Sequence, residues 1–516
     1  MPDRYEDVDL RRGSSRHDLV QRLQRDLIEL GFNGIDKADG VFGRLTYWAV
    51  RDFQAYAAME HVAVVASPGS SIYADQLGRA ATGAARYQGH VSGVVDQATR
   101  AALQIWLASR WRCPVVVEAW TMAGGKRASL VAENIWRHDH VPSSTPRMFV
   151  VDLSDHFGHP ENTSVGDRIV LGDFQKYLQW SGPRSVPPTH TVPEAEMLPS
   201  SLVGRPLEDL SAAERSTYKV VRAVSEVECI GFYDSVNAYD NAFVSAGPCH
   251  WTLGIVSPGG NVSEGELCGF LAYLKHADRA DYDRLMTKFG VEIDETWIDA
   301  TGQPTGKSLF NPDSRKYTGW VAMVDETGQP RRLVEREEDG NYFKTWHWFY
   351  RFVAAGRQLP GYRRAMWTMA RMRLRDIAAA SIDGQLTIGD VFTSERAMAI
   401  LQRWHIRFPG HIVSGGKAGS ALREVYATAR GYVDSWPANP KHWAQRHEDA
   451  LLKALRLRVA TAGGDLPQTI GQVDAWPTWA GGSNPRRYQL SPAIGSLDIS
   501  RGSFKFESAG LPPPPY

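Results

Sequence analysis

The residue of this 516-residue chain best suited to acid chemistry is a glutamate at the end of an apolar helical pattern. Glu228 follows four valines at helical spacing, at positions 220, 221, 224 and 227. The spacing predicts a buried helix whose terminal carboxyl group is partly withdrawn from water. Partial desolvation favours the protonated form of a carboxyl group, which is the form that donates a proton to a leaving oxygen. Neighbouring Glu226 should point in a different direction, so Glu228 is the candidate general acid.

Cleavage of a glycosidic bond also needs groups that activate water or stabilise an oxocarbenium-like centre. A β-hairpin after Glu228 could supply them. Asp240 stands at the expected hairpin tip, and the Thr252 hydroxyl on the returning strand could hold water. Asp234 is an alternative second carboxylate, or it fixes the hairpin by accepting backbone hydrogen bonds. Four further residues either line the expected sugar site or pack within the hairpin: Tyr239, Ser245, His250 and Trp251.

The segment Glu228-Cys-Ile-Gly-Phe-Tyr-Asp234 resembles the pattern Glu-Ser-Gly-Gly-x-(Phe/Tyr)-Asp of lytic transglycosylases in the lysozyme-like superfamily. Thr252-Leu-Gly-Ile255 is similar to the Thr-Ile-Gly-Ile run of phage-type lysozymes. Cys229 and Ile230 depart from the pattern, where serine and glycine are usual. The resemblance implies an α+β domain in which the end of a catalytic helix faces a β-hairpin, and it favours Glu228 over Glu226.

The first hundred residues contain an imperfect repeat, because Gly40–Val50 recurs as Gly93–Leu103. Each copy has a glycine turn, a threonine near a helix start and an amphipathic helix. Residues 23–54 resemble the three-helix peptidoglycan-binding domain, which implies the bacterial cell wall as a partner. Because residues 60–110 depart from that pattern, residues 1–110 are either two degenerate copies or one module with an insertion.

Residues 111–180 are expected to form a small α/β connecting region, with strands near Val115 and Phe149 and a short helix over 173–180. The histidines and aspartates at 138–140 and 155–159 could bind zinc, as in wall peptidases. Because they lack tight ligand spacing, the favoured expectation is loop and cap residues without a metal site. Prolines mark 181–216 as a linker. Residues 217–457 should form the lysozyme-like catalytic domain, and 458–516 a partly irregular C-terminal extension, whose tail from about residue 480 is loosely held or draped over the surface.

Three features are expected inside the catalytic domain. A β insert near 291–335 should flank the cleft, because Ile298-Asp-Ala-Thr-Gly-Gln-Pro304 recurs as Val324-Asp-Glu-Thr-Gly-Gln-Pro330. The aromatic-rich run 342–352 is interpreted as core packing rather than sugar stacking. Residues 393–410 read as a capped helix that backs the catalytic helix.

The composition of the chain limits the classes of partner that the protein is expected to bind. Lys plus Arg and Asp plus Glu both number 58, so we expect no nucleic acid. The absence of a long apolar run predicts no membrane insertion and no secretion signal, hence synthesis in the cytoplasm and action on the wall after release or injection. Four cysteines without zinc-site spacing predict buried thiols, with a Cys229–Cys249 bridge as the alternative. We expect a monomer without cofactor or metal.

The sequence thus predicts a mainly α, multidomain protein. The leading hypothesis is a peptidoglycan glycan-strand hydrolase of the muramidase or endolysin kind, with Glu228 as general acid. The enzyme alternatives are a lytic transglycosylase and a chitosanase-like glycosidase. The non-enzyme alternative is a wall-binding or virion structural protein with an inactive lysozyme-like domain.

Overall fold

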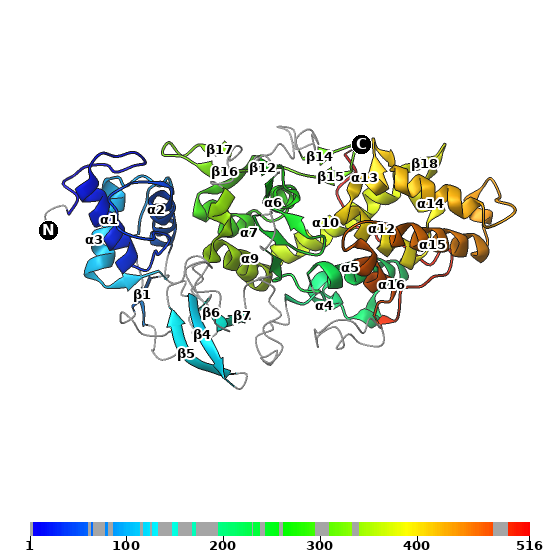
Figure 1. Ribbon diagram of the computed structural model, residues 1–516, viewed down its shortest axis with the longest axis horizontal. Coiled ribbons are helices and arrows are strands. Elements are labelled where there is room, and N and C mark those ends of the chain that lie inside the picture. The colour runs from blue at the N-terminus through cyan, green and yellow to red at the C-terminus, as the bar shows by residue number, and fades with distance from the viewer. Residues whose placement is uncertain are drawn as a thin grey trace.

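The computed structural model describes residues 4–59, 63–65, 78–80, 86–113, 117–123, 126–132, 147–152, 168–171, 195–229, 231–237, 243–256, 262–294, 309–332, 340–477 and 494–515. The described part is mainly helical, as predicted, and elongated (Figure 1). A three-helix module stands at the N-terminal end, and the last helices of the chain stand at the other end (Figure 1). A continuous set of buried apolar side chains runs through both ends.

The N-terminal module consists of α1 (His17–Glu29), α2 (Arg44–Ala57) and α3 (Gln97–Ala108). Its two glycine turns are built alike around a glutamine. The Gln24 side chain accepts from the amide of Gly40 and donates to the carbonyl of Val41 and to the hydroxyl of Thr46. Both turns need glycine, because the φ angles of Gly40 and Gly93 are 78° and 79°.

The second turn repeats these contacts with Gln54. Its side chain accepts from the amide of Gly93 and donates to the carbonyl of Val94 and to the hydroxyl of Thr99. Gln54 belongs to α2, which therefore ends the first unit and begins the second. Between α2 and α3 lie β1 (Ala63–Val65) and β2 (Gly78–Ala80), which form a sheet of order β2-β1-β3 with β3 (Trp111–Arg112). The three helices therefore share two turns of the same build, and both alternatives for residues 1–110, two degenerate copies or one module with an insertion, stay open.

The connecting region contains a four-stranded antiparallel sheet of order β5-β4-β6-β7. Its strands are β4 (Val117–Ala123), β5 (Lys126–Ala132), β6 (Arg147–Asp152) and β7 (Arg168–Leu171). The strand predicted near Phe149 is confirmed as β6, and the one near Val115 begins at Val117. The helix predicted over 173–180 and the histidines and aspartates at 138–140 and 155–159 lie outside the described residues.

The boundary predicted between a linker and a domain at 216 and 217 is wrong, since it falls inside α5 (Ala212–Glu228). Ser211 and Glu214 form a capping box that starts this helix. The preceding α4 (Pro199–Val203) and η4 (Leu207–Asp209) belong to the packed structure, and the Tyr218 hydroxyl of α5 donates to the carbonyl of Met197. Proline content alone therefore misplaced the boundary.

Long helices surround α5. α12 (Glu395–Arg407) packs on α5 and is capped by the Ser394 side chain, as the sequence predicted. The aromatic run is core, as predicted: Tyr342, Phe343 and Trp348 have no exposed surface. The remaining helices are α6 (Glu266–Ala277), α7 (Arg279–Leu285), η5 (Thr287–Phe289), η6 (Asn341–Lys344), α9 (Trp346–Gln358), α10 (Pro360–Ala378), α11 (Ile388–Val391), α13 (Pro409–Ile412), α14 (Ser420–Arg430), η7 (Pro440–His442), α15 (Gln445–Ala460) and α16 (Leu466–Asp474).

The predicted β insert contains β13 (Val291–Asp294), β16 (Trp320–Val324) and β17 (Pro330–Arg332), in the order β13-β16-β17, and the hairpin β14 (Phe310–Asn311) and β15 (Lys316–Tyr317). The turn between β16 and β17 matches the predicted strand-to-turn unit, whereas its partner over 298–304 lies outside the described residues. The three-stranded sheet lies against the N-terminal module, because the Arg51 guanidinium of α2 donates to the carbonyls of Gly290 and Val324. A second small sheet, of order β19-β18-β21-β20, comprises β18 (Ser381–Asp383), β19 (Leu386–Thr387), β20 (Val413–Ser414) and β21 (Lys417–Ala418).

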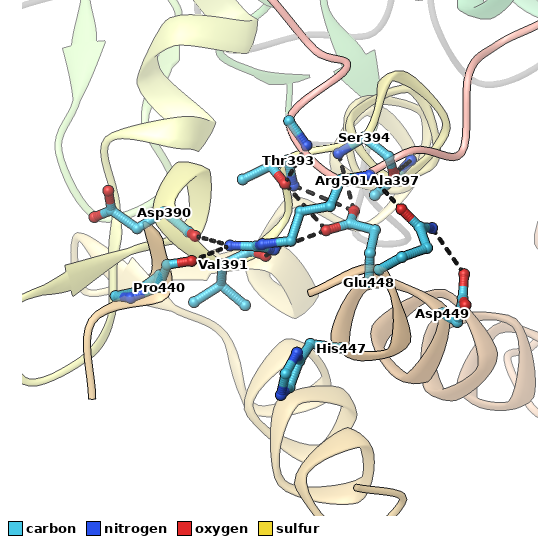
Figure 2. A network of polar contacts seen from close by, with 12 residues as sticks. Asp390, Val391, Thr393, Ser394, Ala397, Pro440, His447, Glu448, Asp449 and Arg501 are labelled. Carbon is cyan, nitrogen blue, oxygen red and sulfur yellow. Dashed lines mark hydrogen bonds and ion pairs between the residues drawn. The ribbon is translucent and has the colours of Figure 1, made fainter. Parts of the chain in front are cut away.

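The C-terminal tail is anchored over residues 494–515, which rules out the loosely held alternative for this stretch and leaves the draped one. The Arg501 guanidinium donates to the Glu448 carboxylate of α15 and to the carbonyls of Asp390, Val391 and Pro440 (Figure 2). Glu448 has no exposed surface and also accepts from Thr393 and Ser394. One buried carboxylate thereby ties the tail to α15 and to the start of α12.

Candidate active site

Glu228 is the last residue of α5, and the packing of that helix places its side chain. Val220, Val221 and Val224 are fully buried on the same helix, while the Glu228 side chain keeps 7% of its surface exposed. Glu226 points elsewhere, as expected, because it binds the Arg222 guanidinium at 2.9 Å. Glu226 is also buried. The two glutamates therefore differ in the side chain that each contacts as well as in the direction in which each points.

Gly231 terminates the helix in a way that only glycine allows. Its φ angle is 78°, and its amide donates to the carbonyl of Ser225. A Cβ atom at this position would stand 2.6 Å from the Arg222 guanidinium, which donates to the Gly231 carbonyl. The glycine of the Glu228-to-Asp234 pattern therefore has a structural reason: it lets the chain turn closely over Arg222.

Two cationic or polar side chains face the Glu228 carboxyl group. Arg403 Nε of α12 lies 2.8 Å from Glu228 Oε1, and Arg403 is almost fully buried. His250 Nδ1 lies 3.7 Å from Glu228 Oε2, and a quarter of the His250 side chain is exposed. The carboxyl group is thus held from the protein side by a guanidinium and borders solvent beside an imidazole.

Three short strands follow the helix: β8 (Val236–Asn237), β9 (Ser245–Ala246) and β10 (Trp251–Thr252), in the antiparallel order β10-β9-β8. His250 immediately precedes β10, at the unusual φ angle of 50°. Thr252 pairs with Ser245 and is half-buried. Asp240 and Tyr239 lie outside the described residues, so their predicted roles remain predictions.

Three other predicted site residues occupy packing positions. Trp251 is buried and stacks on Phe270 of α6 with ring centroids 5.4 Å apart, so its ring face is covered by protein. Ser245 is 1% exposed. Asp234 is also 1% exposed, and its Oδ2 atom lies 2.8 Å from Arg357 Nε of α9. The burial of Trp251 and Ser245 fits the alternative of packing within the hairpin, whereas the printed partner of Asp234 is a side chain of α9 and not a hairpin amide.

The four cysteines are free and buried thiols, as predicted. Burial raises the pKa of the Cys249 thiol to about 12, so it is protonated near neutral pH. The alternative of a Cys229–Cys249 bridge is not realised. Among the described residues, no group of three or more histidine, cysteine or acidic side chains could hold a metal ion.

Sequence reasoning missed Arg403 and a second acidic residue, Glu264. Gly265 forms a bridge with Gly319, and a Cβ atom on it would stand 2.4 Å from the Thr252 carbonyl oxygen. Its neighbour Glu264 is exposed and accepts a hydrogen bond of 2.6 Å from Thr318. In the sequence, Arg403 was marked only by its position next to the apolar face of the helix predicted over residues 393–410. That position did not indicate a contact with Glu228.

Comparison with known families supports one part of this description. Residues 16–60, which include α1 and α2, match the family model described as "Putative peptidoglycan binding domain". The match supports the predicted N-terminal peptidoglycan-binding domain over residues 16–60, and it supports peptidoglycan as a partner. Searches of curated proteins and of solved structures gave no match. No helix in the described ranges is long and apolar enough to cross a membrane.

Proposed function

We propose that this protein cleaves the glycan strands of peptidoglycan, with Glu228 as the general acid. The observation that carries the proposal is the setting of Glu228: a carboxyl group at a helix end, 7% exposed, with Arg403 Nε at 2.8 Å and a partly exposed histidine at its other oxygen. The peptidoglycan-binding family match at residues 16–60 supports the substrate class.

The contacts suggest how the charge would be handled. Protonated Glu228 donates its proton to the glycosidic oxygen as the bond to the anomeric carbon breaks, and it is left as a carboxylate. Arg403 then faces a full negative charge at 2.8 Å, an interaction stronger after proton transfer than before it. An interaction that strengthens along the reaction lowers the barrier.

The oxocarbenium-like centre next takes water, which makes the reaction a hydrolysis. Thr252 and Asp240 are the proposed pair that holds this water. Glu264 is exposed and directly precedes Gly265, which packs against the Thr252 carbonyl. It is therefore a further candidate carboxylate for holding this water. If no group holds water there, the C6 hydroxyl of the sugar attacks instead and the enzyme is a lytic transglycosylase.

The test is digestion of purified sacculi by wild type and Glu228→Gln, followed by mass spectrometry. Reducing-end muropeptides from wild type alone support the hydrolase. Products lighter by one water identify a transglycosylase and keep Glu228 as the acid. Cleavage of chitosan but not of sacculi identifies the chitosanase-like alternative. No product from any glycan contradicts the proposal and favours a wall-binding protein without activity.

Glu424→Gln is the matched control. Glu424 is 61% exposed and pairs with Arg458 at the surface, so its change alters one carboxylate without touching the site. Glu226→Gln is unsuitable as a control, because Glu226 is buried against Arg222 and its loss would disturb α5.

A further inference from the structure

A pocket of about 140 Å³ lies between α4, α5, α10 and the C-terminal tail. Its apolar part is formed by Pro199, Leu202, Val203, Leu210, Tyr218 and Trp367. Three charged side chains also line it: Glu214, Arg371 and Glu507. An apolar cavity of about 150 Å³ is large enough to hold benzene. The apolar part of this pocket therefore fits a branched aliphatic group or a single ring.

Arg371 of α10 is a buried cation at this pocket, with 7% of its surface exposed. Its Nη2 atom donates to the carbonyl of Ala509, and its Nε atom has no hydrogen-bond partner. No carboxylate in the described part of the chain forms an ion pair with it. Burial lowers the pKa of Arg371, and the negative charge of Glu507 opposes that shift. Because a buried charge without a counter-charge in contact is costly, the guanidinium favours an anionic group beside it.

Glu507 brings the opposite charge to the pocket from the tail. Its Oε1 atom accepts from the amide of Ala509 at 2.6 Å, and within the described ranges it forms no ion pair. Its charge acts on Arg371, yet the two side chains are not in contact. The third charged residue, Glu214, is already paired with Arg205. The pocket thus presents one cation and one anion, separated from each other, beside apolar walls.

The tail segment that carries Glu507 is fixed along α5. The Thr217 hydroxyl donates to the carbonyl of Lys505 and accepts from the amide of Glu507. The α5 and α10 walls also meet, since the rings of Tyr218 and Trp367 have centroids 6.5 Å apart. A pocket held in this way loses little freedom when a ligand binds, which favours affinity.

We propose that this pocket binds a free α-amino acid with an apolar side chain. The α-carboxylate of the ligand pairs with Arg371, its ammonium group pairs with Glu507, and its side chain fills the apolar part. A zwitterion satisfies both charges at once, whereas an apolar acid or an apolar amine leaves one of them without a partner. The pocket lies outside residues 16–60, and the proposal is independent of catalysis by Glu228.

The experiment measures binding of L-leucine, L-valine and L-phenylalanine to the full chain by calorimetry and thermal unfolding. We expect L-leucine to bind and to raise the temperature of unfolding, because a ligand of the folded state stabilises it. Isocaproate lacks the ammonium group of leucine and isopentylamine lacks its carboxylate. Each should bind about tenfold more weakly than L-leucine, since each loses one charge-assisted contact. L-glutamate should not bind, because its second carboxylate would enter the apolar part.

Glu507→Gln tests the anionic side of the pocket in a variant expected to fold. The amide keeps an oxygen that can accept from Ala509 and removes only the negative charge. L-leucine should bind this variant about tenfold more weakly, whereas isocaproate should bind it no more weakly than it binds wild type. Glu424→Gln is the matched control, because Glu424 is 61% exposed and pairs with Arg458 at the surface. It should bind L-leucine as wild type does.

Two results would overturn the proposal. One is the absence of binding by all three apolar amino acids, measured both as heat and as a change in thermal unfolding. The other is equal binding of L-leucine and isocaproate to wild type, which would make the pocket a site for apolar acids.

Discussion

Two carboxylate–arginine pairs in this molecule have similar geometry and different surroundings. Asp52 Oδ1 lies 2.7 Å from Arg351 Nη2, and Glu228 Oε1 lies 2.8 Å from Arg403 Nε. The first pair joins α2 of the N-terminal module to α9. The second pair joins the end of α5 to α12.

The two pairs differ in the exposed fraction of their side chains. Asp52 and Arg351 have no exposed side-chain surface, Tyr342 donates to Asp52, and the Arg351 guanidinium lies over the Phe289 ring at 3.7 Å. Glu228 keeps 7% of its surface and has the partly exposed His250 beside it. The same pairing can thus fix two parts of a chain together when it is fully buried, and can leave a carboxyl group bordering solvent, where we propose proton transfer.

Breaking the sealed pair should have the largest effect. Asp52→Ala leaves the Arg351 charge buried without its carboxylate, which costs about 3–5 kcal/mol of unfolding free energy. Chemical denaturation of the full chain measures this loss. Glu228→Gln should lower the unfolding free energy less in the same assay, because glutamine keeps an oxygen that can face Arg403 and the pair borders solvent. Similar losses for both variants would mean that the two pairs serve the same structural purpose.

Arg403→Gln should change activity more than stability. Losing the cation that faces a developing carboxylate at 2.8 Å should lower kcat roughly 10- to 100-fold, which corresponds to a barrier raised by about 1.5–3 kcal/mol. KM should change little, because the interaction strengthens only as the proton leaves Glu228. Steady-state kinetics on soluble glycan fragments separate the two parameters. A rise in KM with constant kcat would assign Arg403 to substrate binding instead.

A buried histidine gives the smallest predicted effect. His405 lies between the Arg373 guanidinium and the Ser314 carbonyl, and burial, with a further contribution from Arg373, lowers its pKa well below 6.5. A lowered folded-state pKa means that the unfolded chain binds the proton first, so stability is lost as the pH falls below about 6.5. The loss should reach about 1 kcal/mol at pH 5.5. Thermal unfolding of His405→Gln should lack this part of the pH dependence, and identical pH curves would contradict it.

The sequence predicted those features of the fold that depend on contacts between residues close together in the chain. The valine spacing before Glu228 indicated a buried helix, and the glycine and threonine repeat indicated a module whose two turns are held by Gln24 and Gln54. The capping box of Ser211 and Glu214 was also local, and it was overlooked because nearby prolines indicated a linker.

Pairings between distant segments could not be predicted in the same way. Arg403 with Glu228, Arg351 with Asp52, and Arg501 with Glu448 each join residues far apart along the chain. A single contact between two helices leaves no repeating pattern in the sequence, so nothing in the spacing of these residues indicated their partners. The stacking of Trp251 was unpredictable for a related reason: its buried partner, Phe270, belongs to α6 and not to the hairpin.

The central claim is that wall binding and glycan cleavage reside in different places, with cleavage at Glu228. The most direct test compares Glu228→Gln with wild type in two assays on the same sacculi: co-sedimentation and release of reducing sugar. We predict unchanged co-sedimentation and a loss of sugar release of at least 100-fold, because the amide cannot donate the proton. Sugar release at the wild-type rate would contradict the account.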